Sequence, residues 1–191
     1  MKETDIIYIK NMVCNRCIKV VREELERLGV TPLSVTLGEV HLLNVPNEEQ
    51  LVGIRNSLAK NGFEQIDTAN TIMIEKIKTS IIELIHYTDN SERQFKYSDY
   101  IQKEVGRDYH SLSALFSSVE GITIEKYIIL QKTERVKELM VYGELSLSEI
   151  AYQTGYSSVA HLSNQFKKTT GLTPTHFKTL RGEKRKPLDK V

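Results

Sequence analysis

This sequence lacks the features that would place the protein in a membrane, outside the cell or among the enzymes. It contains no run of about 18 apolar residues, so we expect no membrane span. The opening residues, MKETDIIYIK, have no apolar signal-peptide core, so we expect a cytoplasmic protein. Patterns of a catalytic triad, a phosphate-binding glycine loop or paired catalytic carboxylates are absent, and we expect no enzyme.

Cysteine is rare, since Cys14 and Cys17 are the only two in the chain. In a reducing compartment, this spacing indicates a metal or redox site rather than a structural disulfide. We expect both thiols at a strand-to-helix junction, where the helix dipole lowers a thiol pKa. Two thiolates alone suit Cu(I), whereas Zn(II) or another thiophilic metal needs further ligands, and His41 is the nearest candidate in sequence. The competing interpretations are a thioredoxin-type redox pair and an idle scaffold motif; against the redox pair, Val13 stands where an aromatic residue is usual.

Positive charge is concentrated towards the C-terminal end. The formal net charge is +1, but residues 146–191 carry 8 Lys and Arg against 3 Asp and Glu, a net +5. Residues 1–90 are net −3 and residues 91–145 are net −1. A surface that binds a polyanion needs such a local excess. The basic tail over residues 182–191 is either a solvated chain end or a phosphate contact.

The first third of the chain alternates strand and helix patterns. Apolar residues at helical spacing indicate two helices, and Gly29 and Gly62 mark where each ends. The predicted elements are a strand over residues 5–12, a helix over 15–28, a hairpin over 33–43 around Gly38-Glu39, a helix over 47–61 and a strand over 63–66. This βαββαβ order predicts a small α+β domain over residues 1–68.

From Thr71 onward the patterns are helical. Helices are predicted over residues 71–88, 97–105, 109–118 and 123–142, with a polar loop over 89–94 and a stop at Gly143. Residues 146–178, SLSEIAYQTGYSSVAHLSNQFKKTTGLTPTHFK, then predict a complete helix-turn-helix unit. In this unit Ser148 is the expected cap of the first helix, and Gly155 forms the turn. The second helix begins near Ser157 or Ser158 and buries Val159, Leu162 and Phe166. Gly171 ends this helix, and Thr173-Pro174 opens another.

The same pattern occurs a second time. YHSLSALFSSVEGITIEKY, residues 109–127, matches VAHLSNQFKKTTGLTPTHF, residues 159–177. The alignment predicts two similar helix-turn-helix units joined by the long helix over 123–142. It lays Leu112 on Leu162, Phe116 on Phe166, Gly121 on Gly171, Thr123 on Thr173 and Tyr127 on Phe177.

Two resemblances to known families cover nearly the whole chain. Residues 71–181 resemble the DNA-binding domain of AraC-type transcription regulators, through SEIAYQTGYSS, the pair Leu162 and Phe166, FKK, and G-x-T-P at Gly171 to Pro174. Residues 5–66 resemble the heavy-metal-associated domain of copper chaperones and metal pumps, through Met12-Val13-Cys14-Asn15-Arg16-Cys17 and Gly62-Phe63. The resemblances imply an α+β protein, with a ferredoxin-like βαββαβ domain followed by an all-α domain with two helix-turn-helix units.

The second helix of each unit supplies the candidate DNA contacts. In a major groove, polar side chains meet base edges and cations meet phosphates. Asn164 can read adenine through two hydrogen bonds, and the two lysines suit phosphate. The predicted contacts are Ser158, Ala160, His161, Ser163, Asn164, Lys167 and Lys168 in the second unit, and His110, Ser111, Ser113 and Ala114 in the first.

These observations predict a transcription regulator that binds double-stranded DNA and responds to a soft metal ion, Cu(I) in the first instance, held by Cys14 and Cys17. RNA polymerase is a further candidate partner, and we expect a monomer or a homodimer with no membrane association. One alternative is a regulator whose N-terminal domain only dimerises or binds a partner. The other, from a different class, is a metal chaperone or redox protein with a helical docking module; the +5 charge and the repeated unit disfavour it.

Overall fold

The computed structural model describes residues 6–88 and 96–179. The chain divides into two compact units, Met1–Thr79 and Ser80–Val191. This division falls inside helix α3 (Ala69–Ile82), later in the chain than the expected boundary after residue 68. The predicted loop over residues 89–94 and the basic tail over residues 182–191 lie outside the described residues.

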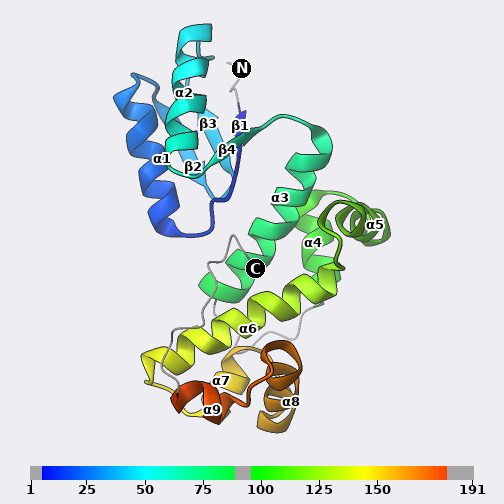
Figure 1. Ribbon diagram of the computed structural model, residues 1–191. Coiled ribbons are helices and arrows are strands. Elements are labelled where there is room, and N and C mark those ends of the chain that lie inside the picture. Colours follow the sequence, from blue (N-terminus) through cyan, green and yellow to red (C-terminus); the bar gives the residue numbers. More distant parts are fainter. Residues whose placement is uncertain (1–5, 89–95, 180–191) are drawn as a thin grey trace. The chain divides into compact units, whose positions relative to one another are not determined.

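The N-terminal unit contains a four-stranded antiparallel sheet in the order β2-β3-β1-β4. Helices α1 and α2 pack beside each other on this sheet (Figure 1). The predicted βαββαβ order is confirmed, and the topology is consistent with a ferredoxin-like fold. The elements are β1 (Ile6–Lys10), α1 (Asn15–Arg27), β2 (Pro32–Thr36), β3 (Glu39–Leu42), α2 (Glu48–Lys60) and β4 (Glu64–Ile66).

Alternation along the strands explains the core of this unit. Ile7 and Ile9 of β1 are buried, while their neighbours on the opposite face are half-buried. The helices contribute one apolar stripe each, with Val21 and Leu25 from α1, and Ile54 and Leu58 from α2.

The hairpin turn was predicted one residue too late. Thr36 pairs with Glu39, so the turn consists of Leu37 and Gly38 rather than Gly38 and Glu39. Gly38 has φ +84°, a conformation that only glycine adopts without strain. A Cβ atom there would also lie 3.3 Å from the methyl carbon of Thr79, so the position favours glycine for space as well.

The second unit is helical throughout its described residues. Its long helix α6 runs between two groups of shorter helices, with α4 and α5 near one end and α7, α8 and α9 at the other (Figure 1). All the predicted helices are present. Their bounds are α4 (Tyr97–Val105), α5 (Tyr109–Glu120), α6 (Ile124–Tyr142), α7 (Leu147–Gln153), α8 (Val159–Thr170) and α9 (Pro174–Thr179).

The predicted helix over residues 71–88 changes its hydrogen-bonding pattern near its end. After α3, Glu83–Tyr87 form a π-helical turn, η1, which the periodicity did not predict. The turn places His86 in the interior, where its Nε2 lies 3.2 Å from Oε1 of Gln131 in α6. Gln131 in turn donates to the hydroxyl of Tyr127 at 2.9 Å. His86 therefore has a structural partner, as an ordinary core histidine would.

The internal repeat is confirmed by the packing of two aromatic pairs. Phe116 and Tyr127 have ring centroids 5.6 Å apart, and the aligned pair Phe166 and Phe177 have centroids 5.5 Å apart. All four side chains are almost completely buried. Each pair joins the second helix of one unit to the helix that follows it, so the two units share the same internal packing.

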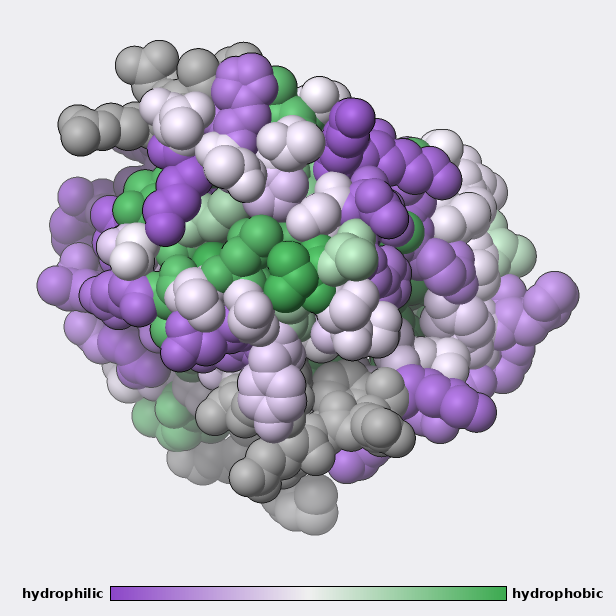
Figure 2. Space-filling view, turned by 90° about the horizontal axis from the view of Figure 1, so that it is seen from below, coloured by the Kyte–Doolittle hydropathy of each residue, from purple (hydrophilic) through white to green (hydrophobic). Residues whose placement is uncertain are grey.

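The core of the second helix-turn-helix unit is bordered by partly buried apolar side chains. Its buried members come from α6, α7, α8 and α9, and Leu145, Leu147 and Leu172 pack against them while remaining only partly buried. On the face seen from below, an apolar patch is framed by hydrophilic side chains (Figure 2). Among the described helices, none has the length and apolar character that crossing a bilayer requires.

We expect Phe166→Ala to lower the free energy of unfolding of the helical unit by about 3–5 kcal/mol, because it leaves a cavity beside Phe177. Lys167→Ala, at the exposed neighbouring position, should change it by less than about 0.5 kcal/mol. Urea unfolding followed by circular dichroism would measure both values. Equal effects of the two substitutions would contradict this account of the core.

Candidate DNA-binding face and thiol pair

The second helix of each unit begins at a side-chain cap. Asp108 accepts a hydrogen bond from the backbone of Ser111 at 3.0 Å, and Ser158 accepts one from the backbone of His161 at 3.1 Å. Ser158 therefore lies just before α8, and its hydroxyl serves the helix backbone. The predicted start of this helix is confirmed.

The expected cap of α7 was wrong by two residues. Ser146, rather than Ser148, caps this helix and forms a reciprocal capping box with Glu149. The backbone amide of Ser146 donates to the Glu149 carboxylate at 2.7 Å. Ser148 lies within α7 instead.

The predicted contact residues share one exposed side of α5 and α8. Each helix buries a leucine and a phenylalanine four residues apart, and the intervening residues point away from the core. Burial matches at every aligned position between residues 109–116 of α5 and 159–166 of α8. The exposed predicted contacts are His110, Ser111 and Ala114 in α5, and Ala160, His161, Asn164, Lys167 and Lys168 in α8. Ser113 and Ser163 are half-buried.

The two helices differ at their C-terminal turns. Lys167 and Lys168 are exposed in the last turn of α8, where cations also suit the helix dipole. The aligned residues of α5 are Ser117 and Ser118, and the Ser118 hydroxyl donates to the carbonyl of Leu115 at 2.7 Å. The second unit therefore presents two cations where the first presents none.

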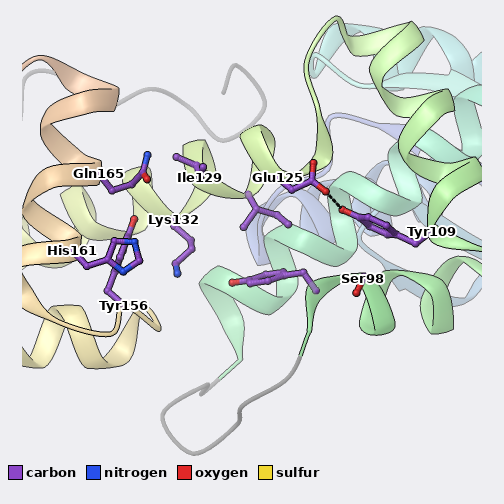
Figure 3. Close-up of a pocket in the computed structure, with 10 residues that line it drawn as sticks. Ser98, Tyr109, Glu125, Ile129, Lys132, Tyr156, His161 and Gln165 are labelled. Atoms are coloured by element: carbon purple, nitrogen blue, oxygen red, sulfur yellow. Dashed lines mark hydrogen bonds between the residues drawn. The ribbon is translucent and has the colours of Figure 1, made fainter.

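A cavity of about 460 Å³ lies beside these helices, and the sequence patterns did not predict it. It is formed by the starts of α4, α5 and α8, by the turn before α8 and by the N-terminal half of α6. Figure 3 shows His161, Gln165, Tyr156 and Lys132 on one side, and Glu125, Tyr109 and Ser98 on the other. The remaining lining residues are Tyr97, Ile128 and Ile129.

The two sides of this cavity are held by polar contacts. The Tyr109 hydroxyl donates to the Glu125 carboxylate at 2.5 Å, and this bond is the main reason that the pKa of Glu125 is lowered. On the other side, the ammonium of Lys132 donates to the carbonyl of Gly155 at 3.2 Å and lies 4.2 Å from the ring centroid of Tyr156. Side-chain contacts within the protein therefore hold the polar groups at both ends of the cavity in place.

The two thiols lie together at the start of α1, as predicted. Cys14 occupies the N-cap position of the helix and Cys17 lies in its first turn, with the sulfur atoms 3.3 Å apart. Both residues are half-buried, and both are free thiols. The loop before them is tied to the α2–β4 turn, because the Asn11 side chain donates to the carbonyl of Gly62 at 3.1 Å. The two parts of the predicted metal-binding motif are thus adjacent.

The helix start affects the two thiols differently. Burial opposes the Cys14 thiolate, but hydrogen bonds from Cys17 and the charge of Arg16 outweigh it and lower the pKa of Cys14. For Cys17 burial dominates and raises the pKa, and the neighbouring Cys14 sulfur adds to this effect. The expectation of a lowered pKa therefore holds for Cys14 alone.

The donor set around the thiols is small. Among residues 6–88 and 96–179, no group of three or more His, Cys, Asp or Glu side chains is placed to hold one metal ion. His41 lies on β3, with its Nε2 3.6 Å from the carboxylate of Glu39. Two sulfur ligands suit Cu(I) better than Zn(II), and the sulfurs must separate to take an ion between them.

Comparison with known proteins concerns the helical unit. Residues 101–179 match a family model described as a helix-turn-helix domain. The xylose operon regulatory protein of Escherichia coli strain K12 is 28% identical over 104 residues, 54% of this chain and 26% of that protein. The probable transcriptional regulator LumQ of Photobacterium leiognathi is 33% identical over 64 residues, 34% of this chain and 26% of that protein. The chain thus spans about a quarter of the length of these curated relatives.

A solved structure shares the fold of this unit. The C-terminal domain of AraT, a response regulator from Geobacillus stearothermophilus, aligns with a TM-score of 0.50 at 20% identity. The alignment covers 62% of this chain and 95% of that structure. Together with the family match and the repeated geometry of α5 and α8, it identifies a helix-turn-helix domain within residues 101–179.

Proposed function

We propose that this protein is a sequence-specific DNA-binding transcription regulator of the AraC family. The observation that carries the proposal is the pair of helix-turn-helix units with the same packing and the same exposed side. In each unit the exposed side of the second helix offers short polar groups, which suit base edges in a major groove. The relatives named as regulators of transcription support the same conclusion.

The connecting helix supports contact with two major grooves at once. Helix α6 has 19 residues, so it is about 28 Å long. Successive major grooves on one side of B-DNA are about 34 Å apart, a comparable length. One chain can therefore present α5 and α8 to neighbouring grooves, and a homodimer would double the site. RNA polymerase is the second candidate partner of such a regulator.

Removing one lysine at the end of α8 should weaken binding to all DNA sequences. We expect Lys167→Ala or Lys168→Ala to flatten the slope of log affinity against log salt by about one unit each, because each removes one phosphate contact. Fluorescence anisotropy with a DNA fragment at several salt concentrations measures the slope. Lys19→Ala, an exposed lysine of α1, is the matched control and should leave the slope unchanged. An unchanged slope in both α8 variants would place these lysines away from DNA.

Asn164→Ala should change sequence preference instead. We expect it to relax discrimination at one base pair, at a cost of about 1–3 kcal/mol for the preferred base, because a bidentate contact is lost. A competition assay with all four base pairs at each position of the selected site would detect this. Asn56→Ala, at an exposed asparagine of α2, is the matched control and should leave the sequence preference unchanged. A uniform loss across every base variant would remove Asn164 from the reading role.

Metal response is the second function that we propose, and the 3.3 Å contact between the Cys14 and Cys17 sulfurs favours it. A soft ion such as Cu(I) would be held by these two thiolates at the start of α1. The lowered pKa of Cys14 supports a thiolate there, and Arg16 balances part of its charge. Binding would change the packing or association of the N-terminal unit and so bias DNA binding. The alternative is an N-terminal unit that only dimerises or binds a protein partner.

Metal binding should require both thiols. We expect the reduced protein to bind one Cu(I) per chain, or one per two chains if four sulfurs share it, in competition with a chelator of known affinity. Cys14→Ser or Cys17→Ser should abolish this binding, while Asn15→Ala, exposed between the thiols, should retain it. Neither serine variant should unfold the helical unit. If DNA affinity is the same with and without Cu(I), Zn(II), Cd(II) or Hg(II), the metal response is wrong and association becomes the role of this unit.

A further inference from the structure

The cavity beside α6 combines apolar walls with a polar group at each end. Its volume of about 460 Å³ is within the range of small-molecule sites. Isoleucine and tyrosine side chains form much of the lining. The carboxylate of Glu125 is already bonded to Tyr109, so one end is satisfied within the protein. The other end contains Lys132, His161 and Gln165 (Figure 3).

Lys132 lacks an acidic partner within the described residues. Its ammonium contacts a neutral carbonyl, that of Gly155, and the ring face of Tyr156. Burial lowers the pKa of Lys132 to about 8. An ammonium has three donors, so this side chain retains capacity for an incoming anion. A partly desolvated cation at the edge of an apolar cavity is a strong anchor for a carboxylate.

We propose that this cavity binds a small aromatic monocarboxylate, with its carboxylate on Lys132 and its ring between the apolar walls, and that this ligand opposes DNA binding. A simple phosphate fits less well, because it would leave most of a 460 Å³ apolar space unfilled. A second acidic group would be disfavoured by Glu125 at the far end. Both arguments favour a ligand that has a single negative charge and is otherwise apolar.

Opposition to DNA binding follows from where the cavity lies. His161 lines it and is also one of the exposed residues of α8 predicted to face DNA. The imidazole of His161 packs edge-on against the ring of Tyr156, with the ring centroids 5.2 Å apart. The Nδ1 atom of His161 lies 3.0 Å from Oγ of Ser157. Tyr109, the first residue of α5, lines the other side. A bound ligand would therefore contact α5 and α8, the two helices proposed to read DNA, and would occupy His161.

Direct binding can be tested with 2-naphthoate, whose fluorescence is easily followed because the chain contains no tryptophan. We expect saturable binding of one molecule per chain. Lys132→Met, which keeps an unbranched apolar stem and removes the ammonium, should weaken it about tenfold or more through loss of the charged hydrogen bond. Lys126→Met, an exposed position on the same helix, should leave it unchanged. The neutral 2-naphthamide should bind about tenfold more weakly than 2-naphthoate, and equally to wild type and Lys132→Met.

The pH dependence provides an independent readout of the anchor. Lys132 is charged below pH 8 and neutral above it, so the affinity for 2-naphthoate should fall about tenfold between pH 7 and pH 9. The fall should persist in His161→Ala and disappear in Lys132→Met. Burial raises the pKa values of Tyr97 and Tyr156 to about 12, so both stay neutral in this range. The other titratable groups that face the cavity are Tyr109, whose pKa is raised first by burial, and Glu125, whose pKa is lowered.

The opposition to DNA rests on the proposed function and has its own measurement. With 2-naphthoate at saturation, the affinity for a double-stranded DNA fragment should fall about fivefold or more, and the fall should be lost in Lys132→Met. Saturable 2-naphthoate binding with unchanged DNA affinity would overturn the opposition alone. Absence of any DNA binding would overturn the proposed function while the direct titration still decides on the cavity.

Two results would overturn the ligand site itself. One is the absence of saturable 2-naphthoate binding to wild type up to about 10 mM. The other is equal binding by wild type and Lys132→Met. If Lys132→Met instead weakens DNA binding and flattens its salt slope without any 2-naphthoate binding, Lys132 is a phosphate contact and the ligand proposal is wrong.

Discussion

The burial of α6 from both ends is the constraint on which the helical unit depends. Tyr127, near its start, packs on Phe116, while Val136 and Met140, near its end, belong to the core that contains Phe166 and Phe177. A helix is stiff over this length, so packing at its two ends fixes the separation of α5 and α8. Neither helix-turn-helix unit can rotate about α6 without breaking one of these cores. The geometry presented to DNA is therefore set by apolar packing rather than by the polar residues that would touch it.

The middle of α6 is polar although it is buried, and this has a different consequence. Glu134 and Lys137 form an ion pair at 2.6 Å that is almost inaccessible to solvent, and Gln131 bridges His86 of η1 and Tyr127. A buried charge or amide is costly without a partner, so an arrangement that separates these groups is strongly disfavoured. The π turn at His86 is part of this arrangement, because it directs the imidazole to Gln131. Polar matching thus selects the register between η1 and α6.

Most elements could be predicted from the sequence because their ends carry local chemistry. Gly121, Gly143 and Gly171 end their helices at positive φ, and Ser158 and Pro174 mark where others begin. The misplaced features depend on contacts distant in sequence or on competition between neighbours. Ser146 and Ser148 both satisfy the rule for a cap, and only the reciprocal bond with Glu149 decides between them. The cavity needs five separated segments, and Lys132 is one lysine among many until Gly155 and Tyr156 are seen to enclose it.

The comparison of the two helix-turn-helix units separates what the fold requires from what remains free to differ. Several positions that repeat between them are buried or have special backbone conformations, such as Leu112 with Leu162 and Gly121 with Gly171. Several positions that differ are exposed, such as Ser118 against Lys168. Exposed side chains barely affect stability, so the same fold can carry a helix without Lys or Arg at one end of α6 and a helix with two lysines at the other. Asymmetry between the two units is thus an electrostatic property imposed on a symmetric core, and it can change without any rearrangement of the packing.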